Sequence, residues 1–125
     1  MNRLREINSA DQLDYGKLTD PVSGEGIVPV ICVDSAILAT EGLLALRMQG
    51  FANEEAVAVT LEIGRATFFS RERQKLWTKG EESGNLLLVR AAYTDCDADS
   101  LLLDVDAQGP SCHAGAETCF VDPDG

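Results

Sequence analysis

Three of the four cysteines, the only histidine and three closely spaced aspartates lie within twenty-five residues near the end of this chain. Asp95-Cys96-Asp97-Ala98-Asp99 comes first, and Cys112-His113 and Cys119 follow. In a reducing compartment, clustered cysteines are more often metal ligands or catalytic groups than disulfides. We therefore interpret the rest of the chain as a scaffold that brings these groups together and supplies a pocket for an anionic substrate.

Length and charge narrow the classes of protein that the chain can represent. Its 125 residues, 45% of them apolar, predict a single domain over 1–125, with an irregular N-terminal extension over 1–26. A formal net charge of −11 argues against binding to nucleic acid or to an anionic membrane. The longest apolar run, 27–33, is too short to cross a bilayer, and the first residues lack the apolar region of a signal peptide, so we expect a cytoplasmic protein.

Strands dominate the predicted fold, which is α+β and mainly β. Alternating or β-branched segments predict strands over 27–33, 66–69, 86–94 and 101–106, with Pro29 at a sheet edge or a strand start. The segments 37–40 and 43–48 flank Glu41-Gly42 as in a hairpin, with Gly50 as the break of the second strand. The segment 109–125 reads as a loop, and Cys32 reads as a buried thiol within its strand.

Helix signals occur at two places. Asn53 is a good N-cap, and Gly64 is a good terminator, so we predict one main helix over 54–63. Its apolar residues Ala56, Val59 and Ile63 share one face at helical spacing. Ser9 and a glutamine three residues later predict a short helix near 9–13 in an otherwise loop-like N-terminal segment.

The aspartate triplet suggests a site for a hard cation. If 95–99 continues an extended strand, Asp95, Asp97 and Asp99 point one way and Cys96 points the other. Carboxylate oxygens suit Mg²⁺, whereas a thiolate suits Zn²⁺. An EF-hand loop is excluded, because its sixth position holds Ser100 instead of glycine. A solvated acidic turn without an ion is the alternative.

The cysteines suggest zinc. Cys96, Cys112 and Cys119 would form a site of three thiolates with an open fourth position, which is what a catalytic zinc needs to hold water. His113 could occupy that position and close the site, or it could stay free as a general base. The residues alone leave both roles open.

Half of the ten basic residues lie between positions 65 and 79, which suggests a local anion site. They are Arg65, Arg71, Arg73, Lys75 and Lys79. The whole polar segment 70–85 combines arginine forks, lysines and glycine-flanked serine and asparagine, all suited to phosphate, although it is not a Walker A loop. Trp77 could stack on a base or pack in the core. A solvated basic loop is the alternative reading.

Four blocks of sequence occur together in a known order. They are Phe69-Ser70-Arg71, Leu76-Trp77-x-Lys79-Gly80-x-x-Ser83-Gly84-Asn85, Asp95-Cys96-Asp97-x-Asp99 and Gly109-Pro110-x-Cys112-His113-x-Gly115-x-x-x-Cys119-Phe120. With these blocks, about 27–120 of the chain resembles the phosphoribosyl-AMP cyclohydrolases of histidine biosynthesis. Because the chain ends soon after Phe120, the resemblance leads us to expect no fused pyrophosphohydrolase domain.

The resemblance implies a zinc hydrolase that opens the adenine ring of 1-(5-phosphoribosyl)-AMP at the N1–C6 bond. It implies small, twisted, barrel-like sheets in an intertwined homodimer, with Cys96 of one subunit joining Cys112 and Cys119 of the other around zinc. Asp95, Asp97 and Asp99 would hold Mg²⁺, and His113 would assist proton transfer. The implied substrate-binding residues are Ser70, Arg71, Arg73, Trp77, Lys79, Gly80, Ser83, Gly84 and Asn85.

Two other functions are weighed against this one. The first is a noncatalytic, zinc-stabilised dimer that binds a nucleotide. The second is a related zinc hydrolase or deaminase acting on another purine nucleotide. The phosphate-friendly segment 70–85 disfavours the noncatalytic dimer, because a purely structural zinc would not require a phosphate pocket. It does not separate the two enzymes.

Overall fold

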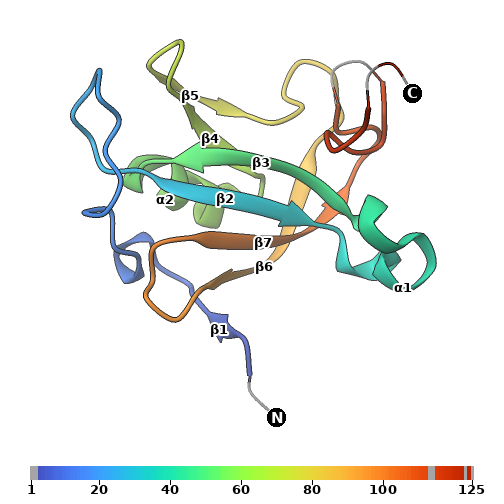
Figure 1. Ribbon diagram of the computed structural model, residues 1–125, viewed down its shortest axis with the longest axis horizontal. Helices are drawn as coiled ribbons and strands as arrows, with labels where there is room; N and C mark the ends of the chain where they lie inside the picture. Colours follow the sequence, from blue (N-terminus) through green and yellow to red (C-terminus); the bar gives the residue numbers. More distant parts are fainter. Residues whose placement is uncertain (1–2, 113–114, 123, 125) are drawn as a thin grey trace.

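A five-stranded sheet and a separate two-stranded hairpin form the framework of the protein (Figure 1). The computed structural model describes residues 3–112, 115–122 and 124. The large sheet has the order β1-β6-β7-β2-β3, in which β2 and β7 are parallel and the other pairs are antiparallel. Its strands are β1 Arg5–Glu6, β2 Val28–Val33, β3 Leu46–Ala52, β6 Leu87–Thr94 and β7 Leu101–Ala107. The hairpin consists of β4 Thr67–Ser70 and β5 Lys75–Thr78.

Short helical elements connect these strands. The α-helices are α1 Leu38–Glu41 and α2 Glu54–Ile63, and the 3-10 helices are η1 Ala10–Gln12, η2 Ser35–Ile37 and η3 Gly42–Ala45. The α+β, mainly β prediction is therefore confirmed. Within the described residues, no helix combines the length and apolar character that crossing a membrane requires.

Apolar side chains at every second position of β2 and β7 form the centre of the core. Val28, Val30 and Cys32 are buried on one face of β2, and Leu101 and Leu103 are buried on β7. Period-two burial is what a sheet covered on one face produces. The expectation that Cys32 is a buried thiol is confirmed. Pro29 lies near the start of β2, before the ladder with β7 begins at Val30, so its missing N–H costs no hydrogen bond on that side.

The main helix has the predicted bounds. The Asn53 side chain accepts a hydrogen bond from the Ala56 amide at 2.9 Å, and Gly64 ends the helix with a φ of +71°. The predicted apolar face is wrong in part, because Ile63 is 48% exposed and the buried residues are Ala56, Val57 and Thr60. The Thr60 hydroxyl accepts from the Thr67 amide at 2.9 Å, so a hydrogen bond to β4 orients the helix.

The predicted hairpin over 37–48 is wrong. Residues 35–45 form the consecutive helical turns η2, α1 and η3, and Gly42, with a φ of +59°, ends α1. The true partner of β3 is β2, whose residues pair from Val28 with Ala52 to Val33 with Leu46. Gly50 does not break β3. It leaves room for the Phe68 ring, because a Cβ there would lie 2.7 Å from a ring carbon.

The N-terminal segment also contributes to the sheet and the core. The short helix predicted near 9–13 is present as η1, and Gln12 Oε1 accepts from the Ser9 amide at 2.9 Å. The two-residue strand β1 pairs with the end of β6 and was not predicted, because two charged residues carry no alternation signal. Ile7 and Leu13 are buried in the core.

Candidate functional site

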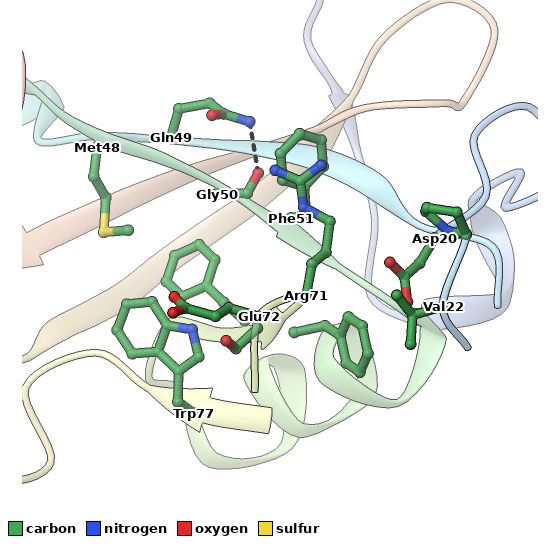
Figure 2. A pocket seen from close by; sticks show the side chains of 13 residues that line it. Asp20, Val22, Met48, Gln49, Gly50, Phe51, Arg71, Glu72 and Trp77 are labelled. Carbon is green, nitrogen blue, oxygen red and sulfur yellow. Dashed lines mark hydrogen bonds between the residues drawn. The ribbon is translucent and has the colours of Figure 1, made fainter. Parts of the chain in front are cut away.

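A pocket of about 570 Å³ opens between β3, the β4–β5 hairpin and a loop of the N-terminal segment (Figure 2). Its lining residues are Asp20, Pro21, Val22, Met48, Gln49, Gly50, Phe51, Phe68, Phe69, Ser70, Arg71, Glu72 and Trp77. The wall is therefore partly aromatic and carries one arginine. Such a mixture suits a ligand with a flat ring and an anionic group.

Arg71 extends from the hairpin turn towards β3. Its guanidinium carbon lies 4.1 Å from the centroid of the Phe51 ring, which is a cation–π contact (Figure 2). Among the described residues, ion pairs within 4.0 Å involve only Lys17 and Arg90 as cations. Arg71 thus keeps its charge available for an anion.

The hairpin corrects part of the sequence prediction for 70–85. The segment is not a continuous loop, because Lys75–Thr78 forms β5 and pairs with β4. In the turn between the strands, Ser70 Oγ accepts from the Arg73 amide at 3.1 Å. Arg73 lines a smaller pocket of about 260 Å³ with Ser70, Glu72 and Trp77. The two pockets therefore adjoin each other, because Ser70, Glu72 and Trp77 line both.

Trp77 packs in the core, as one of the two predictions for it required, and it also borders the pockets. Its ring centroid lies 5.2 Å from that of Phe68, so it packs against the core. It also lines both pockets and is half-buried. Stacking on a base remains a prediction.

The other predicted substrate residues, 79–85, lie apart from the main pocket. Gly80 and Gly84 both have a φ of +82°, and the Gly84 amide donates to the Gly80 carbonyl at 2.7 Å. The Asn85 side chain approaches Gly109, where an added Cβ would lie 2.5 Å from its oxygen. The loop 79–85 therefore borders the start of the C-terminal segment that carries Cys112 and Cys119, which we call the cysteine segment. The predicted substrate residues thus fall into two groups, one at the main pocket and one beside the cysteine segment.

Hydrogen bonds fold the cysteine segment into a tight loop on β3. The Cys112 amide donates to the Ala116 carbonyl at 3.0 Å, and the Cys119 amide donates to the Arg47 carbonyl at 2.8 Å. Burial raises the pKa of Cys119, the charge of Lys79 opposes this shift, and the neighbouring Cys112 thiol adds to it. Cys112 and Cys119 therefore lie together beside Lys79. His113 lies outside the described residues.

Cys96 lies at the other end of the sheet. It follows β6 in an exposed turn, whereas the cysteine loop follows β7, and Figure 1 shows the two at opposite ends. The seven residues of β7, about 20 Å of extended chain, lie between the turn that holds Cys96 and the start of the segment that holds Cys112. In the described part of the chain, the cysteines form no group of three that could hold one ion. One chain thus brings together two of the three predicted zinc ligands.

The aspartate triplet converges, but not for the predicted reason. The backbone at 95–98 is a turn, with Ala98 at a φ of +61°, so strand alternation does not apply. One carboxylate oxygen from each of Asp95, Asp97 and Asp99 lies within 4.8 Å of the others. Lys17 Nζ approaches this group, at 3.1 Å from Asp97 Oδ2 and 3.4 Å from Asp99 Oδ2.

The three carboxyl groups perturb one another. Desolvation pushes the pKa of Asp95 upward, but hydrogen bonds with Ser100 and Asp99 outweigh it and lower the pKa to about 2. The pKa of Asp99 is raised, first by its hydrogen bond with Asp95 and then by that with Asp97. A cluster of this kind favours a cation, which the Lys17 ammonium supplies in this structure.

Several pocket residues carry no signal in the sequence. Asp20 and Val22 come from a segment predicted as loop, and Phe51 comes from the end of the misassigned hairpin. Phe51 reaches the pocket because β3 pairs with β2 and not with 37–40. A prediction that β3 pairs with β2 would have placed Phe51 opposite Pro29. The contact of Phe51 with Arg71 in the turn 71–74 is visible only in the structure.

Comparison with known proteins agrees with these features. The family model described as phosphoribosyl-AMP cyclohydrolase matches residues 48–121, which include most of β3, the β4–β5 hairpin, the aspartate turn and the cysteine loop. The phosphoribosyl-AMP cyclohydrolase of Micrococcus luteus is 50% identical over 95 residues, 76% of this chain and 71% of the relative. That of Bacillus cereus is 44% identical over 100 residues, 80% of this chain and 93% of the relative.

Longer relatives match as well. The histidine biosynthesis bifunctional protein HisIE of Xanthomonas campestris pv. campestris is 47% identical over 113 residues, which are 90% of this chain and 49% of the relative. The chain spans about half the length of such bifunctional relatives. The matched segment and the coverage of the shorter relatives together establish the relationship. The chain belongs to the phosphoribosyl-AMP cyclohydrolase family.

Proposed function

We propose that the protein hydrolyses the N1–C6 bond of the adenine ring of 1-(5-phosphoribosyl)-AMP, as a cytoplasmic step of histidine biosynthesis. The observation that carries the proposal is the pocket in which Arg71, without a carboxylate partner among the described residues, lies over Phe51. It occurs in a chain that belongs to the family named for this reaction.

The pocket supports binding of the phosphorylated ribose ends. The substrate carries two phosphate monoesters, and an arginine fork is well matched to such a group. Arg71 and Arg73 line two adjoining pockets that share Ser70 and Trp77. We assign phosphate binding to this turn. The formal charge of −11 makes such local cations necessary for holding an anion.

We assign the ring-opening chemistry to the cysteine loop. Cys112 and Cys119 of one subunit and Cys96 of a second would hold zinc, and their thiolates fit that metal. When bound, zinc supplies a water whose pKa is lowered to about 7. Lys79 places a positive charge near Cys119 and favours the ionised form of that thiol. His113, next to Cys112 in sequence, is our candidate for delivering the proton that N1 needs as its bond to C6 breaks.

The aspartate turn fits a hard cation. Three carboxylate oxygens within 4.8 Å of one another are the ligands that Mg²⁺ prefers. We propose that Asp95, Asp97 and Asp99 hold Mg²⁺ and that this ion offsets phosphate charge.

We propose an intertwined homodimer in which barrel-like sheets form between the two chains. The separation of Cys96 from the cysteine loop supports it, because a second chain can bring the missing thiolate. Exposed leucines on the segment 35–45 also support an interface, since Leu43 is 78% exposed and Leu38 and Leu44 are more than two-fifths exposed.

The test of the activity is direct. Purified protein with zinc and magnesium is mixed with phosphoribosyl-AMP, and ring opening is followed by ultraviolet absorbance, with Cys112→Ser as the inactive control. Absence of turnover would refute the proposal. Release of ammonia from another purine nucleotide instead would identify a deaminase.

Mixed dimers test the shared site. Cys96→Ala and Cys112→Ala proteins are each expected to be inactive, and a mixed dimer regains one site with all three thiolates. Mixed dimers that form but stay inactive would contradict the intersubunit assignment.

A further inference from the structure

A buried carboxylate stands beside the pocket without a cationic partner among the described residues. Asp20 is only 2% exposed, and its Oδ2 accepts hydrogen bonds from the Ser23 amide at 3.0 Å, the Ser23 hydroxyl at 2.7 Å and Gln74 Nε2 at 2.9 Å. Burying a charge is costly unless hydrogen bonds replace water. These bonds, that from Gln74 first, lower the pKa of Asp20 and keep it ionised.

Gln74 connects this carboxylate to the turn 71–74 between β4 and β5. Its Nε2 donates both to Asp20 Oδ2 at 2.9 Å and to the Arg71 carbonyl at 2.7 Å. The two bonds use both N–H groups of the amide. Gln74 also has a φ of +56°, which is uncommon for a residue other than glycine. The bridge joins residues 54 positions apart and compensates for that backbone conformation.

Arg71 is held at two points as a result. Gln74 holds its carbonyl oxygen, and Phe51 holds its guanidinium at 4.1 Å from the ring centroid. Asp20 and Val22, on either side of Pro21, line the same pocket. A side chain already held in its binding conformation loses less entropy when the ligand arrives.

We propose that Asp20 and Gln74 are positioning residues that fix Arg71 for the anionic end of the substrate, so that the loop at 20–24 forms part of the binding site. This inference rests on the proposed function, since it takes a phosphate monoester of the nucleotide as the group that Arg71 meets. Neither residue touches the reacting ring. Both act through the backbone and orientation of Arg71.

The test uses Gln74→Gly, Asp20→Ala and the double variant. Glycine adopts a φ of +56° without strain, so Gln74→Gly removes the amide bridge and leaves the turn possible. We expect each single variant to raise KM for phosphoribosyl-AMP about three- to tenfold, the value of about one hydrogen bond. The kcat should change little, because the lost interaction is made equally in the ground and transition states. The KM of the double variant should be no higher than that of the more impaired single variant, because both substitutions remove the same hydrogen bond between Asp20 and Gln74.

Gln12→Ala is the matched control. Gln12 also makes two side-chain hydrogen bonds in the N-terminal segment, accepting from the Asn8 and Ser9 amides at 2.8 and 2.9 Å, but it does not line the pocket. It should lower Tm and leave KM unchanged. An equal rise of KM in Gln12→Ala would show general destabilisation and overturn the inference.

The two proposals fail in different ways. A wild-type protein that never turns over phosphoribosyl-AMP refutes the proposed function. A wild type that does, together with a Gln74→Gly variant of unchanged KM, refutes only the positioning role. If Asp20→Ala does not fold, Asp20→Asn keeps the side-chain volume and should raise KM less than Gln74→Gly does.

Discussion

Two glycines in the loop 79–85 allow one steric contact to be measured against an internal reference. Gly80 and Gly84 share a φ of +82°, so alanine is strained equally at both. An added Cβ at Gly80 would lie 2.3 Å from the Asn85 backbone carbon and oxygen, whereas at Gly84 it would meet nothing within 4 Å. Gly84→Ala should therefore cost only the left-handed penalty, about 1–2 kcal/mol. Gly80→Ala adds an overpacking cost of about 1–3 kcal/mol, because backbone atoms cannot swing away.

Urea unfolding at one fixed protein concentration measures this difference. Trp77 is the only tryptophan and packs on Phe68, so its fluorescence reports loss of the core. We expect the unfolding free energy to fall by about 2–5 kcal/mol in Gly80→Ala and by clearly less in Gly84→Ala, with the slope against urea unchanged. Equal losses in the two variants would refute the reasoning, since they would mean that the loop relaxes away from Asn85.

Lys17→Met removes the ammonium that lies against Asp97 and Asp99, so magnesium binding measured by calorimetry should tighten about two- to fivefold; unchanged affinity would show that Lys17 does not compete. Burial first, and the nearby Cys119 second, raise the pKa of the Cys32 thiol from 9.0 to about 12. The folded state therefore favours the neutral thiol, and this contribution to the free energy of unfolding is lost as the pH rises from about 9 to 12. Cys32→Ala should lower stability at pH 7 and flatten this decline, by up to about 1.4 kcal/mol per pH unit, in denaturation curves taken across that range; an unaltered decline would contradict the assignment.

Local signals in the sequence predicted the helix and most strands. Asn53 and Gly64 act through bonds within a few residues of themselves, so the bounds of α2 could be predicted without knowing its neighbours. The long alternating segments of β6 and β7 were equally clear. The face of α2 was not, because the Thr60 hydroxyl orients it through a bond to a strand that follows the helix.

Long-range pairing explains the errors. The segment 37–48 carries apolar residues on both sides of Glu41-Gly42, as a hairpin does, yet the backbone of β3 finds its partner in β2. The aspartates were grouped correctly, although a turn and not a strand brings them together. The residue types predict metal chemistry, which stays a prediction, and only the fold shows that Cys96 lies apart from the other two thiols of its own chain.

The pocket was the least predictable part. Arg71 was predicted from the basic segment in which it lies. Asp20 and Phe51 reach the pocket only through tertiary contacts. A single bond between Gln74 and Asp20 spans 54 positions, and nothing local in either segment encodes it.

Strand β3 acts as a fixed spacer between the two halves of the site. Near one end, the Arg47 carbonyl accepts from the Cys119 amide, and near the other, Phe51 lies under the Arg71 guanidinium. Four residues of extended chain separate these points by about 13 Å. A one-residue insertion between them would lengthen that span by about 3.3 Å and reverse the faces of the strand beyond it. For the substrate binding that we propose, the backbone of this one strand therefore sets the length of the molecule that reaches both ends, and substitutions in the surrounding loops leave that length unchanged.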